Sequence, residues 1–255
     1  MFYSGTDYAV VKDPNFVGWD NYRVVLTDPA FWTAMGKTFY VLAVCIVVEL
    51  VLGMAIAMLF NREFKGQNIV RGLCLLPLLV APLAMALIWN YILHANLGIF
   101  NQILTWIGLN KVDFFAPDTA LFTIMFITIW QWTPFSIFVI LAGLKSLPRD
   151  AFEAAKIDGS SGWYTFRRLT LPMLTPLIMI IVLLRTMWLI RLFDPIYTTK
   201  GAVGTETLDW MVYRNTFLFF DVGRGSAMAI ISLFITMIIT AIMFRVLMKA
   251  MGVIK

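Results

Sequence analysis

Five long apolar runs constrain this chain more than any other feature of its sequence. Each is long enough to cross a hydrocarbon core of about 30 Å as a helix. In lipid, backbone groups must find their hydrogen bonds within the spanning segment, so runs of this kind fold as helices. The sequence therefore predicts an all-α, polytopic helical membrane protein with five transmembrane helices, at residues 38–60, 70–93, 119–142, 171–197 and 226–248.

The composition agrees with this class of protein. Of the 255 residues, 60% are hydrophobic and 14% are charged, and the net charge is +5. The basic residues lie mainly in short loops, where they set the topology of a membrane protein, so the charge does not indicate nucleic acid. The expected partners include membrane lipid and no nucleic acid. His94 is the single histidine, which excludes a histidine-based metal cluster. Cys45 and Cys74 lie in apolar runs, where thiols pack as small hydrophobic groups.

The distribution of Lys and Arg predicts the topology. The loops at 61–71 and 143–170 and the tail after Arg245 are basic and are expected in the cytoplasm. The segments 94–118 and 198–225 carry more acidic residues and are expected outside. With five spans and an internal C-terminus, residues 1–37 become an external N-terminal arm.

A polar segment at residues 146–170 separates the third and fourth apolar runs. Ser146 is expected to cap a helix over about 147–157, and Gly159 to end it in the left-handed conformation. Ser160 or Ser161 can then begin a second short helix that runs to about Leu169. The alternative is an ordinary amphipathic cytoplasmic loop.

The first of these two helices has the make-up of a contact surface for another protein. Its alanines keep it slim, Phe152 and Ile157 offer apolar anchors, and Glu153 offers a polar contact at the rim. The residues expected to make the contact are Ala151, Phe152, Glu153, Ala154, Ala155, Ile157, Asp158 and Gly159.

The spacing of this segment resembles a known motif. Glu153-Ala154-Ala155, then Gly159, then Leu169 and Leu171-Pro172, is similar to the coupling motif in permease subunits of binding-protein-dependent ABC importers. Downstream, Leu-Arg-Thr-Met-Trp at 184–188 and Phe-Asp-Pro-Ile-Tyr at 193–197 resemble carbohydrate importers, most closely the first permease of the maltose and glycerol-phosphate systems. In those importers a glycine-rich loop follows the second stretch, and residues 199–204 of this chain differ from its usual sequence. The resemblance covers nearly the whole chain from Phe16. Permeases of this type usually begin with one more helix, and we expect that leading helix to be missing here.

The resemblance implies a multi-subunit machine in the plasma or inner membrane of a bacterium or archaeon. The implied partners are a second homologous permease, a cytoplasmic ATPase dimer that uses ATP and Mg, and an external substrate-binding protein. The chain has no Walker A pattern, so it is expected to bind no cofactor and not to be an enzyme. The alternative function is a self-sufficient secondary carrier or channel, but ionisable groups are concentrated in one span instead of several.

Sugar sites combine aromatic faces with hydrogen-bonding side chains. The expected pathway residues are Glu49, Asn90, Gln131, Trp132, Arg185 and Trp188. A charge at membrane depth is costly unless it is paired or faces water, so Glu49 and Arg185 should point into the bundle or a cavity.

Two neighbouring features have simpler structural interpretations. Arg191 and Asp194 can form a mutual pair on one helix face, and Trp89 and Tyr91 can belong to the aromatic belt at the membrane interface. Prolines are expected to kink three of the spans, at Pro77 and Pro82, Pro134 and Pro176.

Overall fold

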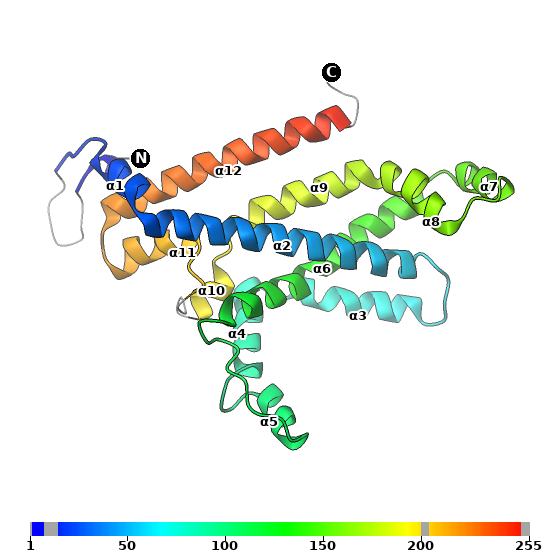
Figure 1. The fold of residues 1–255 in the computed structure, drawn as a ribbon, viewed down its shortest axis with the longest axis horizontal. Coiled ribbons are helices and arrows are strands. Elements are labelled where there is room, and N and C mark those ends of the chain that lie inside the picture. The colour runs from blue at the N-terminus through cyan, green and yellow to red at the C-terminus, as the bar shows by residue number, and fades with distance from the viewer. Residues whose placement is uncertain (1, 8–14, 200–203, 251–255) are drawn as a thin grey trace. The chain divides into compact units, whose positions relative to one another are not determined.

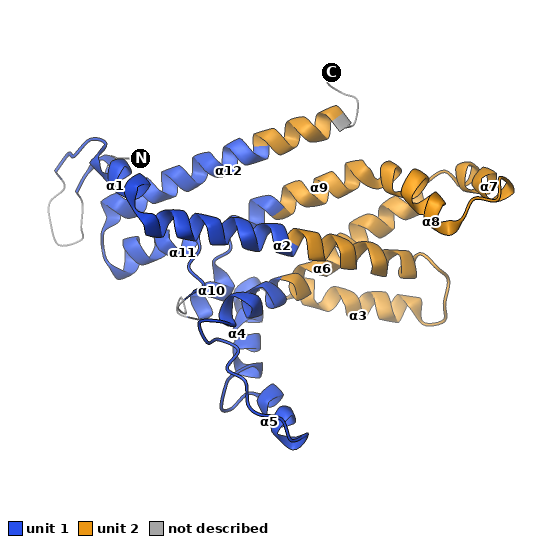
Figure 2. Cartoon of the chain, viewed as in Figure 1, with its two compact units in different colours: residues 1–45, 81–128, 186–240 blue, residues 46–80, 129–185, 241–255 orange. Residues whose placement is uncertain are grey.

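The computed structural model describes residues 2–7, 15–199 and 204–250. These residues are helical or irregular, with one isolated antiparallel bridge between Thr6 and Phe16. The chain divides into two compact units, which Figure 2 shows in different colours. Unit 1 comprises residues 1–45, 81–128 and 186–240, and unit 2 comprises residues 46–80, 129–185 and 241–255.

Four helices in the described part of the chain are long and apolar enough to cross a membrane, and a bent pair makes a fifth if it is one span. The all-α membrane fold expected from the sequence is thereby confirmed. In chain order (Figure 1) the elements are η1 Phe2–Gly5, α1 Asp20–Thr27, α2 Pro29–Phe60, α3 Gln67–Leu79, α4 Pro82–Ile92, α5 Ile99–Trp106, α6 Ala120–Ser146, α7 Arg149–Ile157, α8 Gly162–Thr165, η2 Phe166–Thr170, α9 Leu171–Leu189, α10 Asp194–Thr198, α11 Leu208–Tyr213, η3 Arg214–Leu218 and α12 Val222–Ala250.

The first spanning helix begins earlier than its apolar run. α2 starts at Pro29, inside the stretch expected as an external arm. Proline suits the first position of a helix, because the N–H that it lacks would have no partner within the helix there. The Asp28 carboxylate accepts a hydrogen bond from the N–H of Ala30 (2.9 Å) and so satisfies another free donor. Hydropathy alone misses this start because the first turns mix polar and apolar residues.

The second predicted span is not one continuous helix. α3 and α4 are bent by 98° at a break after Leu79, so a single helix over 70–93 is wrong. The reason is Pro82, which was expected to kink a helix and instead begins one. The proline ring disfavours helical backbone angles at the residue before it, and Ala81 accordingly has an extended backbone, with ψ of 136°. Pro134 and Pro176, in contrast, lie inside α6 and α9, which the structure assigns as uninterrupted helices.

Unit 1 has its own apolar core. It joins α1, the first part of α2, α11 and the first part of α12 through Val25, Phe31, Ala34, Leu208, Met211, Ala227 and Met228. The hydroxyl of Thr38 accepts a hydrogen bond from the N–H of Leu208 (3.1 Å), which anchors the start of α11 on α2.

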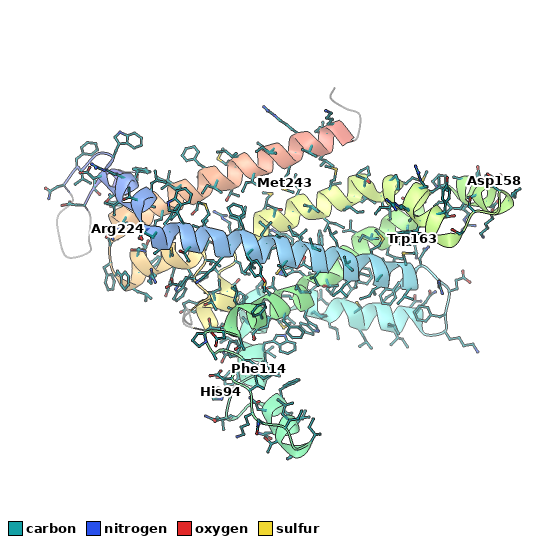
Figure 3. All side chains as sticks on the ribbon, in the orientation of Figure 1. His94, Phe114, Asp158, Trp163, Arg224 and Met243 are labelled. Atoms are coloured by element: carbon teal, nitrogen blue, oxygen red, sulfur yellow. The ribbon has the colours of Figure 1, made fainter. Side chains whose placement is uncertain are left out.

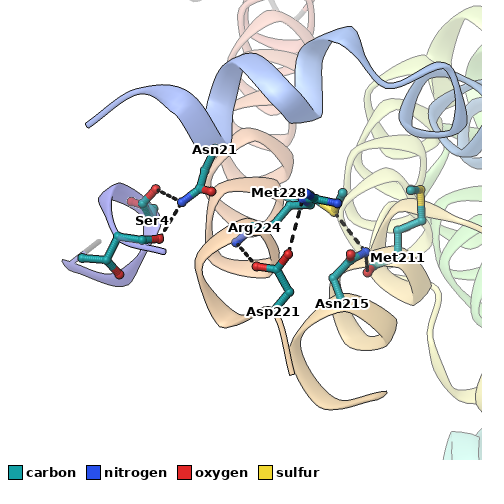
Figure 4. Close-up of polar contacts among 8 residues, drawn as sticks. Ser4, Asn21, Met211, Asn215, Asp221, Arg224 and Met228 are labelled. Atoms are coloured by element: carbon teal, nitrogen blue, oxygen red, sulfur yellow. Dashed lines mark hydrogen bonds and ion pairs between the residues drawn. The ribbon is translucent and has the colours of Figure 1, made fainter. Parts of the chain in front are cut away.

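Polar contacts support the same unit (Figure 4). Asn21 donates to the carbonyls of Ser4 and Thr6, and Asn215 donates to the carbonyl of Met211 (2.8 Å). The Asn21 bonds tie the N-terminal segment to α1, and the Asn215 bond lies within the continuous helical segment formed by α11 and η3.

Unit 2 contains the second core, in which α2, α6 and α9 meet. Its buried members are Ala57, Phe60, Ile137, Ile140, Leu141, Leu174 and Ile181. At Gly53 a Cβ atom would lie 2.7 Å from the Cβ of Ser136, closer than real contacts allow. Small residues let membrane helices approach closely, and Gly53 does so for α2 and α6.

Candidate functional site

The polar segment after α6 forms the expected helix, with a different start. α7 begins at Arg149, after Pro148, and not at residue 147. The expected cap at Ser146 is wrong, because Ser146 is the last residue of α6 and its hydroxyl donates to the carbonyl of Gly143 (2.8 Å). A serine near a helix C-terminus has such carbonyls within reach, and this local bond competes with capping the next helix.

The end of α7 is the expected left-handed glycine turn. Gly159 has φ of +70°. The N–H of Ser160 donates to the carbonyl of Ala155 (3.0 Å), and the N–H of Gly159 donates to the carbonyl of Lys156 (3.1 Å). This is the bond pattern of a Schellman motif, which closes a helix sharply. The turn gives α7 a defined end.

Ser161 begins the next helix, as expected, because its hydroxyl accepts from the N–H of Tyr164 (3.2 Å). The expected end of this helix near Leu169 is wrong. α8 passes through the π-helical turn η2 directly into α9, so the chain stays helical from Gly162 to Leu189. Pro172 is therefore in the second position of α9 and does not interrupt the path.

The surface of α7 is open. None of its residues is buried, and Glu153, Ala154, Ile157, Asp158 and Gly159 are exposed, whereas Ala151, Phe152 and Ala155 are half-buried. The side chain of Ile157 is 87% exposed. Figure 3 shows Asp158 at the tip of this segment. Of the two expected apolar anchors, Phe152 packs partly against its own chain, and Ile157 is free to contact another.

A basic cavity of 830 Å³ adjoins α7 within unit 2. Its charged lining consists of Arg62, Glu63, Arg71, Lys145, Arg149, Glu153 and Lys156. Five cations against two carboxylates make this face of the coupling region positive, which favours an acidic surface on any partner.

Three of the predicted pathway residues meet in unit 2. Arg185 of α9 donates to both carboxylate oxygens of Glu49 of α2, from Nε (2.6 Å) and Nη2 (2.7 Å), and its guanidinium lies over the ring of Trp132 of α6, 4.7 Å from the ring centroid. Glu49 is 0% and Arg185 is 1% exposed. Both side chains are thus buried and paired inside the protein, as expected from the free-energy cost of an unpaired charge at membrane depth. The pairing itself was not predicted, although one acid and one base in otherwise apolar runs are a signal for it.

The other three predicted pathway residues have separate surroundings. Gln131 is buried and donates to the carbonyl of Val80 (3.0 Å), which the break before α4 frees from helical bonding. Asn90 donates to the carbonyl of Thr198 at 3.4 Å, and Trp188 is exposed. Of the two aromatic residues expected at the membrane interface, Tyr91 is exposed and Trp89 packs edge-to-face on Phe126.

The expected Arg191–Asp194 pair on one helix face is wrong. α9 ends at Leu189 and α10 begins at Asp194, so the two residues do not share a helix. Asp209 of α11 instead interacts electrostatically with Arg191. Burial raises the pKa of the Asp209 carboxyl, and the charge of Arg191 partly opposes this rise.

An aromatic cluster in unit 1 was not predicted as a group. Phe193, Tyr197, Trp210, Tyr213 and Phe217 are linked by ring contacts with centroids 5.1–6.4 Å apart. The sequence places these rings in two short segments, and only the fold brings them together.

The fold is that of a polytopic helical membrane protein that presents a slim, exposed helix, α7, between two membrane-length helices. The chain belongs to the family described as binding-protein-dependent transport system inner membrane component, which matches residues 49–252. It is thus a permease subunit of an ABC transporter.

Curated relatives agree over most of the chain. A probable ABC transporter permease protein, y4oQ of Sinorhizobium fredii, is 36% identical and covers 94% of this chain and 80% of its own. The trehalose/maltose transport system permease protein MalF of Thermococcus litoralis is 33% identical, with 94% of this chain and 82% of that protein covered.

The fold is also similar to a solved structure. This is a bacterial alginate ABC transporter in complex with an alginate pentasaccharide-bound periplasmic protein, with a TM-score of 0.80, 21% identity, and 89% of this chain and 81% of that chain covered.

Proposed function

We propose that this chain is one of two permease subunits of an ATP-driven carbohydrate importer, receives its solute from an external binding protein, and is driven by a separate ATPase dimer. The observation that carries the proposal is the exposed α7, with its Glu-Ala-Ala sequence and Gly159 turn. The carbohydrate class rests on relatives named for trehalose, maltose and sulfoquinovosyl glycerol transport.

In this proposal α7 lies in a groove of the ATPase, with Ile157 as the apolar anchor and Glu153 at the rim. A helix seated in a groove transmits motion only if its ends are held. The Schellman turn at Gly159 holds one end, and the unbroken helical path from Gly162 into α9 carries the displacement toward the membrane. Alternating access then follows from a rigid-body shift of packed helices.

The cluster of Glu49, Trp132 and Arg185 supports a role for unit 2 in the solute pathway. Its aromatic face and charged groups are the chemistry that carbohydrate sites use. We propose that Gln131, in the same unit, also lines the pathway, together with residues of the second permease. Asn90 and Trp188, which belong to unit 1, are proposed as pathway residues separately. ATP and Mg belong to the partner ATPase in this scheme.

Symmetry supports the proposal of a second permease. A two-fold ATPase dimer presents two equivalent grooves, and this chain supplies one coupling segment. A homologous subunit would fill the second groove and face the polar residues of this one.

Reconstitution tests the proposal directly. The chain is placed in liposomes alone, and in parallel with its ATPase, second permease and binding protein, and uptake of labelled disaccharides is measured with internal ATP. We expect uptake only from the complete set. Saturable flux through the chain alone would contradict the proposal and favour a self-sufficient carrier.

A further inference from the structure

An apolar groove of 810 Å³ lies on unit 2 between α2 and the α8–α9 segment. Its walls are aliphatic and aromatic, with Val51 and Met54 from α2, Phe166 from η2 and Leu171 from α9, and Ile140 of α6 lies beneath them. Among the residues that line it, Arg62 is the only charged one. The groove thus has the shape and chemistry for hydrocarbon along its length and for an anion at one end.

More positive charge lies beside the same end. Trp163, whose side chain is 70% exposed, lines both this groove and a neighbouring hollow of 730 Å³ that contains Arg167 and Arg168. Both of these arginines are exposed. Within the described residues, no carboxylate lies within 4.0 Å of Arg62, Arg167 or Arg168. Trp163 is therefore shared by the apolar groove, which Arg62 lines, and by the neighbouring hollow, which Arg167 and Arg168 line.

This arrangement matches the two parts of a phospholipid. Acyl chains fill apolar grooves between membrane helices, arginine binds phosphate, and tryptophan prefers the headgroup level. The basic loops also predict that this end faces the cytoplasm, where anionic lipids are attracted by juxtamembrane cations. The three arginines have no carboxylate within 4.0 Å among the described residues, so they favour an occupant that carries an anionic group beside its apolar part.

We propose that this groove is a binding site for an anionic phospholipid, with the acyl chains along α2 and α9 and the phosphate at Arg62, Arg167 and Arg168. The lipid would fill the space between α2 and the helical path that leads from the coupling helix into the membrane. The proposal does not depend on the transported solute.

Native mass spectrometry of the purified full chain in detergent tests the site, with phosphatidylglycerol and phosphatidylcholine of equal chain length added in turn. Phosphatidylglycerol should bind more tightly. Because each arginine near the surface contributes on the order of 1 kcal/mol, replacing one by Gln should weaken binding about fivefold, and replacing all three roughly a hundredfold. All three are surface residues, so the variants should fold.

Two further variants separate the parts of the site. Ala55→Trp fills the groove without changing charge and should weaken binding of both lipids, because Ala55 lines the groove and is exposed. Arg245→Gln removes an exposed cation of α12 that lines neither hollow and should leave binding unchanged.

Equal binding of the two lipids, or phosphatidylglycerol binding that survives the triple variant, would overturn the proposal. A second preparation, in which the chain is copurified with the second permease, completes the test. Loss of that permease with Ala55→Trp, while the purified variant chain still binds phosphatidylglycerol as the unsubstituted chain does, would show that a protein helix occupies the groove and would also overturn the proposal.

Discussion

The buried ion pair of Glu49 and Arg185 allows a quantitative prediction. Arg185→Met removes two hydrogen bonds of 2.6 and 2.7 Å and leaves the Glu49 carboxylate buried without its counter-charge. Breaking a buried pair by removing one partner costs about 3–5 kcal/mol, and the cation–π contact with Trp132 adds up to about 2 kcal/mol. The double variant Glu49→Met/Arg185→Met replaces both charges by apolar groups, which is often close to neutral. We therefore expect a coupling free energy of about 3 kcal/mol or more between the two sites.

Reversible unfolding in mixed micelles, with increasing fractions of denaturing detergent, measures these free energies. The control is Arg224→Met, because Arg224 and Asp221 form an ion pair of 3.4 Å whose side chains are 42% and 38% exposed (Figure 4). An exposed pair of this kind contributes about 0–1 kcal/mol, so the control should lose little stability.

The reasoning is refuted if Arg185→Met is no more costly than Arg224→Met, or if the double variant is as unstable as the sum of the two single variants. The same variants address the solute pathway. A double variant that is stable but transports nothing would support a pathway role for the pair, and one that is stable and active would restrict the pair to holding α2 and α9 together.

Three shorter predictions concern residues outside the long apolar helices. Glu153→Lys and Gly159→Pro should each abolish uptake while the subunit stays in the membrane, because the first reverses a rim charge of α7 and the second cannot adopt the φ of +70° at the turn. In a cysteine-free background, single cysteines at Lys65 and Asn110 should be labelled from opposite sides of the membrane, the first from the cytoplasm and the second from outside, as the basic loops require. Asp209→Asn should raise the thermal stability at neutral pH, because burial disfavours the Asp209 carboxylate and raises its pKa above the unfolded value.

Each of these predictions has its own contrary result. Normal uptake with normal stimulation of the ATPase by either α7 variant would remove the coupling role. Labelling of both cysteines from one side would contradict the topology. For Asp209 the folded-state pKa is the higher one, so the penalty is fully present above it, shrinks as the pH falls through it, and is gone below the unfolded pKa of about 3.9. A stability gain in Asp209→Asn that does not shrink on acidification would exclude this cause.

The membrane class and the presence of a short helix in the polar segment, α7, could be predicted because both depend on short-range physics. A run of apolar residues partitions into lipid whatever the rest of the chain does. The end of α7 at Gly159 likewise follows from the backbone preference of glycine, and the cap at Ser161 from the reach of its own hydroxyl. The start of α7 was missed because Ser146 had a second local partner, the Gly143 carbonyl, and the sequence does not rank the two.

Contacts between distant residues were decided by the tertiary structure. Glu49 and Arg185 are 136 positions apart, and the sequence required only that each avoid lipid. Whether Pro82 would bend a helix or begin a new one depended on partners for the freed backbone, and Gln131, 51 positions away from Val80, supplies one. Arg191 and Asp194 do not share a helix because α9 ends at Leu189, and the charge of Arg191 acts on Asp209 instead. Local preferences thus determined which segments become helices and where the turn at Gly159 lies. Packing decided the long-range partners of buried polar groups such as Glu49 and Gln131, because they depend on which distant segments the fold brings within hydrogen-bonding distance.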